Sequence, residues 1–132
     1  MKKIFYLCFG LLLISSTCSK DEPCQASTTI INNSQKIIYF SSRAYNQLGD
    51  SPDLNSISYK ISPNSIKKYG GANCEEKSFE ETGKVYYFLF DEQVLLNNTW
   101  EDVVANDLVL KRYSFTLQEM QASNWTIIYD GN

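Results

Sequence analysis

The sequence predicts a mainly β protein, with an antiparallel, β-sandwich-like domain of about seven strands and two short helices. One observation behind this prediction is that short apolar runs alternate with turn-forming residues, which is typical of all-β domains. The other is the length, because 132 residues are enough for one compact domain and too few for two. We therefore expect a single β-rich domain at residues 28 to 132.

Seven segments have the apolar, aromatic and β-branched composition of strands. They are residues 28 to 32, 36 to 41, 56 to 62, 65 to 69, 84 to 90, 108 to 115 and 125 to 129. The run at 85 to 90 is apolar on both faces, which predicts a central strand that is covered on both sides. The connectors between the strands are rich in Asn, Ser, Pro and Gly, which favour turns.

Two short helices are expected between the later strands. The first begins at a cap formed by Asn98 or Thr99 and has acidic residues in its first turn. The second covers about residues 117 to 122, where Thr116 and Glu119 fit a capping box. The connection that holds this second helix is shorter than the dozen or more residues of a parallel crossover. The strands on either side of it are therefore expected to be antiparallel or to belong to different sheets.

The composition excludes several classes of chemistry. The sequence contains no histidine, so Ser-His and Cys-His nucleophile pairs, imidazole bases and His-containing zinc sites are impossible. The formal net charge is −3, whereas phosphate binding requires a positive surface. We therefore expect a noncatalytic protein with no metal, no cofactor and no nucleic-acid partner.

The N-terminal residues have the organisation of a secretory signal. Lys2 and Lys3 precede an uncharged run at residues 4 to 14, which is followed by small polar residues and then by Cys18. The run is shorter than the roughly 20 apolar residues that a membrane-spanning helix needs. We therefore expect residues 1 to 17 to be a signal peptide that is removed.

Cys18 and the residues before it resemble the lipobox of bacterial lipoproteins, in which a cysteine becomes the lipid-modified first residue. The resemblance implies that Cys18 is lipidated and anchors the protein to a membrane. The number of cysteines agrees with this, because signal removal leaves Cys18, Cys24 and Cys74, and lipidation of the first leaves an even pair. The alternative is ordinary signal cleavage that leaves Cys18 as a thiol.

Lys20, Asp21 and Glu22 resemble the Lys-acid-acid export signal of surface-displayed lipoproteins in Bacteroides-type bacteria. The resemblance implies a protein of the outer membrane that is exposed on the cell surface, with residues 18 to 27 as a lipidated tether. The alternative is a lipoprotein that faces the periplasm, with the charges serving only to solvate the tether.

The C-terminal part of the chain also resembles a family. Residues 98 to 100, 108 to 119 and 124 to 129 resemble the closing part of small uncharacterised lipoproteins of Bacteroides-type bacteria. This resemblance supports the same cellular compartment and implies no activity.

Cys24 and Cys74 are expected to form a disulfide, because an exported chain passes through an oxidising space. Closing a loop of this size removes about 4 kcal/mol of unfolded-state entropy in the chain-entropy model. The alternative is two separate buried thiols.

The longest connector, residues 42 to 55, is the candidate contact surface. Loops beyond about 12 residues that have no structure of their own are uncommon in compact domains, and they are often functional or disordered. Arg43 and Tyr45 lie on this connector, and with Trp100 they are the candidate ligand contacts. The alternative is a mobile polar loop that binds nothing.

These features predict a surface-exposed, lipid-anchored, noncatalytic binding or accessory module. Its ligand is unknown from the sequence, and a glycan and a protein are the two candidates. One alternative is a structural subunit of an envelope or fimbrial assembly, which would present an unpaired apolar edge strand. Another is a small carboxylate-dependent hydrolase, which needs two carboxylates on either side of a cleft. The acidic residues at 75 to 81 are expected to form a solvated charged loop instead of such a site.

Overall fold

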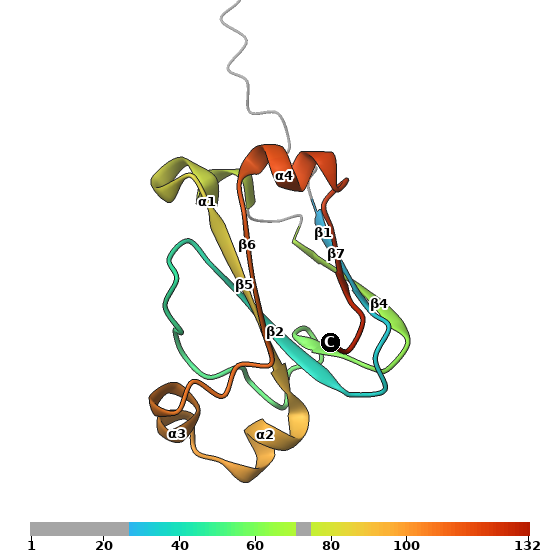
Figure 1. Cartoon of the computed structure of the whole chain (residues 1–132), viewed down its shortest axis with the longest axis vertical. Coiled ribbons are helices and arrows are strands. Elements are labelled where there is room, and N and C mark those ends of the chain that lie inside the picture. The colour runs from blue at the N-terminus through green and yellow to red at the C-terminus, as the bar shows by residue number, and fades with distance from the viewer. Residues whose placement is uncertain (1–26, 71–74) are drawn as a thin grey trace, which may run out of the picture.

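The computed structural model describes residues 27–70 and 75–132, in which seven strands form two sheets accompanied by four short helices (Figure 1). The predicted mainly β class is therefore confirmed. The predicted signal peptide, residues 18 to 26 of the predicted tether and Cys74 lie outside the described residues. Within 27–70 and 75–132, no helix has the length and apolar character to cross a membrane.

The three-stranded sheet is built around the first described strand. β1 (Ser27–Asn32) lies in the middle, antiparallel to β4 (Ser65–Gly70) and parallel to β7 (Thr126–Tyr129). Its side chains alternate between buried and partly exposed positions, as expected when one face of a sheet is packed and the other meets solvent. Among the described strands, the β1–β7 pair is the exception to an antiparallel arrangement, and it places the first and last strands side by side.

The four-stranded sheet is antiparallel throughout. Its order is β3 (Lys60–Ile61), β2 (Ile38–Arg43), β5 (Val85–Asp91) and β6 (Lys111–Phe115). The strand expected at residues 56 to 62 is therefore reduced to its last part. The residues before Lys60 form a turn, in which the backbone N–H of Ser58 donates to the hydroxyl of Ser56 at 3.3 Å.

β5 lies between two hydrophobic cores, which explains why its sequence is apolar on both faces. Val85, Tyr87 and Leu89 belong to the core that includes residues of β1 and β7. Phe88 and Phe90 belong to a second core on the opposite face of the same sheet. All five side chains are at most 2% exposed, and each such burial stabilises the fold by about 1.5–3 kcal/mol. The predicted central strand, covered on both sides, is confirmed.

The helices lie at the two ends of the four-stranded sheet. Figure 1 shows α1 (Glu75–Thr82) and α4 (Leu117–Ala122) at one end, and α2 (Glu92–Asn97) and α3 (Trp100–Ala105) at the other. Leu95 of α2 and Val103 of α3 contribute buried side chains to the second core. Partly buried residues of the connector between β2 and β3, residues 44–59, pack against the same core. The second core therefore combines helices and an irregular connector.

Two of these helices match the prediction. α3 begins after Thr99, whose hydroxyl accepts a hydrogen bond from the backbone N–H of Asp102 at 3.2 Å. α4 begins at the predicted capping box, in which Thr116 and Glu119 each satisfy a backbone N–H of the other. In both cases the capping residues were the signal in the sequence.

The other two helices were not predicted, and α1 corrects the expectation of a charged loop at residues 75 to 81. Phe79, which is 5% exposed, anchors α1 in the first core, with its ring centroid 6.1 Å from that of Trp125. One apolar residue among acids gives no helical period to recognise. Asp91 is both the last residue of β5 and the N-cap of α2. Because the capping residue belongs to the strand, the sequence predicts the strand but gives no separate signal for the start of the helix.

The two sheets are joined through α4. β6 belongs to the four-stranded sheet and β7 to the three-stranded sheet, which is the second of the two arrangements expected for this connection. The hydroxyl of Tyr113 on β6 donates to the backbone carbonyl of Ile128 on β7 at 2.9 Å. This hydrogen bond links the edges of the two sheets on that side of the molecule.

Candidate ligand-binding site

A pocket of about 340 Å³ lies where the end of β2 meets the connector and the end of β4. This volume falls at the lower end of the roughly 300–1,000 Å³ found for small-molecule sites. Its lining combines aromatic, charged and hydroxyl groups; the aromatic residues are Phe40, Tyr59 and Tyr69, and the charged ones are Arg43, Asp50 and Asp53. We call this space the Arg43 pocket.

The aromatic part of the Arg43 pocket is a cluster of three rings. Phe40 is fully buried and forms the base, with its centroid 4.8 Å from Tyr69 and 5.8 Å from Tyr59. Both contacts have edge-to-face geometry, which is a favourable arrangement of aromatic rings. The two tyrosines are partly exposed, so apolar ring surface remains next to the open side of the pocket.

Arg43 brings a positive charge that no described side chain compensates. Among the side chains that the structure describes, those of residues 27–70 and 78–132, no hydrogen bond or ion pair reaches its guanidinium, and its Nε is buried without a partner. The guanidinium lies directly against Gly49, where an added methyl group would overlap it. Neither Asp50 nor Asp53 forms an ion pair with Arg43, although both acids line the same pocket. An unpaired buried donor is costly, and this makes the site unusual.

The connector that carries Asp50 and Asp53 is held in place by hydrogen bonds from two aromatic side chains of the second core. The indole N–H of Trp100 donates to the carbonyl of Gly49 at 3.0 Å, and the hydroxyl of Tyr39 donates to the carbonyl of Leu54 at 3.0 Å. Leu48 and Leu54 also pack against the second core. An irregular segment with these contacts presents its polar side chains in a defined arrangement.

Of the three predicted contact residues, the structure places only Arg43 in the pocket lining. Tyr45 is 53% exposed, and its hydroxyl donates to the carboxylate of Glu81 on α1. This hydrogen bond is the main cause of a raised pKa at the Tyr45 hydroxyl, and desolvation raises the pKa further. Trp100 packs on Phe90 at a centroid distance of 5.5 Å and holds the connector through Gly49. Tyr45 and Trp100 therefore fasten the connector at two points.

The sequence analysis missed the aromatic residues of the pocket. Tyr59 was assigned to a strand, and Tyr69 was placed at the end of another, where both would serve as packing residues. Only their position next to turns distinguishes them from core aromatics, and that signal is weak. Asp50 and Asp53 are recognisable in the sequence only as polar residues of a long connector.

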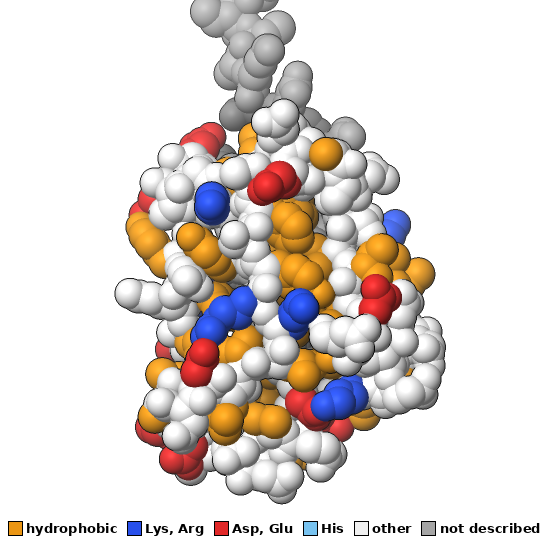
Figure 2. Space-filling model, in the orientation of Figure 1, with side chains coloured by type: hydrophobic (Ala, Val, Ile, Leu, Met, Phe, Trp, Pro, Cys, Tyr) orange, Lys and Arg blue, Asp and Glu red, His pale blue; other side chains and the backbone are white. Residues whose placement is uncertain are grey.

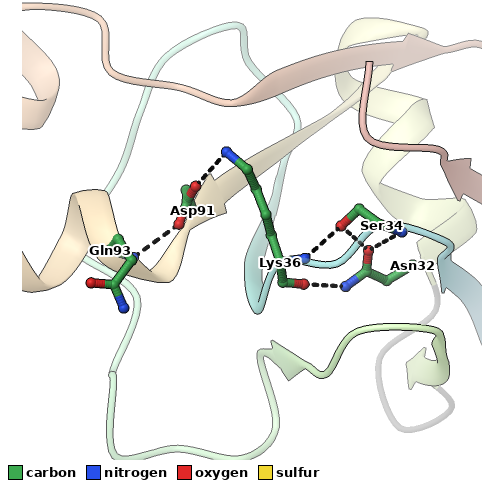
Figure 3. Close-up of polar contacts among 5 residues, drawn as sticks. All are labelled: Asn32, Ser34, Lys36, Asp91 and Gln93. Carbon is green, nitrogen blue, oxygen red and sulfur yellow. Dashed lines mark hydrogen bonds and ion pairs between the residues drawn. The ribbon is translucent and has the colours of Figure 1, made fainter.

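A second hollow, of about 330 Å³, lies on another part of the surface and is lined by residues 35 to 37 and 91 to 93; we call it the Lys36 cleft. Its charges are paired, as Figure 3 shows: Lys36 Nζ lies 2.7 Å from Asp91 Oδ2, and Asp91 Oδ1 accepts from the backbone N–H of Gln93 at 2.9 Å. Burial raises the pKa of Asp91, but the hydrogen bonds from Lys36 and Gln93 outweigh it, so the pKa is lowered overall. The hydrogen bond to Asp91 raises the pKa of Lys36.

The Lys36 cleft is also supported by a buried asparagine (Figure 3). The side-chain amide of Asn32 donates to the carbonyls of Lys36 at 2.8 Å and Ser62 at 3.0 Å. Its oxygen accepts from the backbone N–H and the hydroxyl of Ser34, at 3.0 and 2.6 Å. Both polar atoms of the Asn32 side chain therefore have partners within the protein, and these hydrogen bonds connect the segments that form the Lys36 cleft.

The remaining surface offers weaker features. On the face shown in Figure 2, acidic and basic side chains are interspersed among hydrophobic ones instead of forming one area of a single charge. Ile66, Ile31 and Ile128 lie in register across the three-stranded sheet, and the first and last of these are exposed. Among the described residues, no group of three or more acidic or cysteine side chains is arranged to hold a metal ion.

The predicted lipidation, disulfide and export residues, Cys18, Cys24, Cys74, Lys20, Asp21 and Glu22, lie outside the described residues. Comparison of the chain with family models, with curated proteins and with solved structures found no match.

Proposed function

We propose that this protein is a lipid-anchored module of the bacterial cell surface that binds a carbohydrate in the Arg43 pocket without transforming it. The observation that carries the proposal is the uncompensated guanidinium of Arg43 beside the partly exposed rings of Tyr59 and Tyr69. Sugars present hydroxyl groups to polar side chains and C–H faces to aromatic rings. The pocket offers partners for both.

The arrangement of acids favours binding over hydrolysis. A glycosidase needs two carboxylates on opposite sides of the scissile bond, one of them positioned to donate a proton. Asp50 and Asp53 both come from the same connector, and both are exposed. They are suited to accept hydrogen bonds from sugar hydroxyls.

The edges of the sheets give little support to a structural subunit that assembles by strand addition. Two edge strands carry cationic side chains, Lys67 and Lys68 on β4 and Lys111 and Arg112 on β6. A third edge strand, β3, has only two residues. The fourth edge strand, β7, is apolar, but it has only four residues and its Ile128 carbonyl already accepts a hydrogen bond from Tyr113. Charged and short edge strands discourage pairing with another chain.

The test is a glycan-array screen of the mature protein, purified in detergent, followed by titration of each hit. We expect Arg43→Ala and Tyr59→Ala to weaken binding of the hit at least tenfold. Tyr113→Phe is the matched control, because it removes a tyrosine hydroxyl whose hydrogen bond to the carbonyl of Ile128 lies outside the pocket, and it is expected to bind as the wild type does. Binding that is unchanged in Arg43→Ala and Tyr59→Ala would place the site elsewhere. Mass spectrometry of the recovered glycan distinguishes binding from cleavage.

The anchor is tested separately. Metabolic labelling with a fatty acid is expected to mark the wild type and not Cys18→Ala. Alanine at Lys20, Asp21 and Glu22 together is expected to protect the protein from protease added to intact cells. A labelled Cys18→Ala protein would rule out the lipid site, and unchanged proteolysis of the triple variant would leave those three charges without a role in export.

A further inference from the structure

The charges of the Arg43 pocket suggest which class of sugar it accepts. Its lining has one cation, Arg43, and two anions, Asp50 and Asp53. Asp53 also accepts a hydrogen bond from the backbone N–H of Asn55 at 2.9 Å, which fixes the position of one carboxylate oxygen. The lining therefore has an excess of one negative charge, and the whole chain has the same sign.

The depth of these groups differs. Arg43 closes β2, is half-buried and is held against Gly49, whereas Asp50 and Asp53 are exposed on the connector. The two carboxylates are therefore more accessible to a ligand in the pocket than the guanidinium is. A group that satisfies all three has to donate hydrogen bonds to the acids and accept them from the arginine.

A hydroxyl group meets this requirement, because it is both a donor and an acceptor. A carboxylate is an acceptor only, so it would satisfy Arg43 while facing two groups of its own charge. The apolar rings of Phe40, Tyr59 and Tyr69 line the same space and strengthen the local field relative to open solvent. Electrostatics here therefore disfavour an acidic sugar even though an arginine is present.

We infer that the Arg43 pocket binds neutral sugars and discriminates against the corresponding uronic acids, with Asp50 and Asp53 as the residues that determine this specificity. The inference rests on the carbohydrate-binding function proposed above. Arg43 is the shared donor to either kind of sugar, and the two acids supply the selection.

The experiment compares matched pairs by isothermal titration of the mature protein in detergent at neutral pH. The probes are glucose with glucuronate and galactose with galacturonate. At low ionic strength we expect the neutral member of a bound pair to bind about five- to tenfold more tightly, since two like charges act across a partly screened pocket. The ratio is expected to shrink as salt approaches 1 M, where the screening length falls to about 3 Å.

Two variants separate charge from geometry. Asp50→Asn with Asp53→Asn removes both negative charges while keeping side-chain size, and it is expected to bring the affinity ratio to one or to reverse it. Gly49→Ala keeps every charge but pushes the Arg43 guanidinium away, so it is expected to weaken both members of a pair without reducing the ratio. Thermal unfolding of each variant establishes that it is folded before titration.

The outcomes are distinguishable. Equal or tighter binding of the uronate by the wild type would overturn the inference and leave carbohydrate binding in place. A neutral preference that persists in the double Asn variant would also overturn it, because the selection would then come from other residues. If neither member of either pair binds and the array yields no hit, the proposed function itself fails.

Discussion

The Arg43 pocket and the Lys36 cleft have nearly the same volume, about 340 and 330 Å³, yet they treat their charges in opposite ways. In the Lys36 cleft, Lys36 and Asp91 neutralise each other at 2.7 Å. In the Arg43 pocket, the guanidinium has no partner within the described residues, and two acids lie in the same lining without pairing to it. Charges that pair within the protein stabilise its fold, whereas an unpaired guanidinium beside partly exposed rings can bind a ligand. Substitutions in the Lys36 cleft should therefore lower stability, whereas substitutions in the Arg43 pocket should weaken ligand binding.

The largest effect is expected from Asn32→Ala at the Lys36 cleft. The change leaves the carbonyls of Lys36 and Ser62 and the groups of Ser34 without their partner, so the free energy of unfolding should fall by about 2–4 kcal/mol. Urea unfolding followed by circular dichroism measures the change. Asn33→Ala is the control, because Asn33 is exposed and makes a surface hydrogen bond to Asp130. An equal loss of unfolding free energy in the two variants would show that the hydrogen bonds of Asn32 stabilise the fold no more than a surface hydrogen bond does.

A smaller effect is expected from Asp91, which caps α2 and pairs with Lys36. Asp91→Ala should lower the free energy of unfolding by about 1 kcal/mol at neutral pH, because the cap of α2 is lost. The pKa of Asp91 is lowered in the folded protein, so its ionised form stabilises the fold above the ordinary value of 3.8. This contribution is lost as the pH falls below 3.8 through the folded-state pKa.

Asp91→Asn tests this pH dependence, because asparagine retains a good N-cap and does not titrate. The advantage of the wild type over Asp91→Asn should be constant near neutral pH and should shrink as the pH falls below 3.8, as measured by urea unfolding at each pH. A difference that does not change with pH would mean that the charge of Asp91 does not stabilise the fold.

The smallest effect on stability is expected in the Arg43 pocket. Arg43→Met keeps the length of the side chain and removes an unpaired buried donor at the expense of some packing, so the free energy of unfolding should not fall, and any change should be a gain of less than about 1 kcal/mol. The matched variant at the other hollow, Lys36→Met, should be destabilising because it deprives Asp91 of its cation. The comparison between the two regions would break down if Arg43→Met proved the more destabilising of the two.

The sequence was informative where a local signal is strong. The apolar run of β5 and the Thr116–Glu119 capping box were recognisable because burial on both faces and a capped first turn each leave a distinct pattern. α1 was missed because Phe79 is the one apolar residue in its sequence, and the acids around it show no helical period.

The candidate site was predictable only in part. Arg43 was recognised from its place on a long connector, but the rings of Tyr59 and Tyr69 meet Phe40 only through the tertiary fold. The absence of a partner for Arg43 Nε is likewise a property of the folded molecule, which no sequence spacing encodes. The signals in the sequence identified the segment, and the packing of three strands determined the pocket.

The parallel pairing of β1 with β7 has a consequence for the time at which the protein can fold. Thr29 pairs with Thr126, so the three-stranded sheet joins residues near opposite ends of the described chain. Contacts between such distant residues are slow to form, because a large loop has to close before any packing energy is gained. A chain released in order from its N-terminus cannot complete this sheet until its last strand has emerged. The topology thus delays completion of the three-stranded sheet until the last strand has been synthesised.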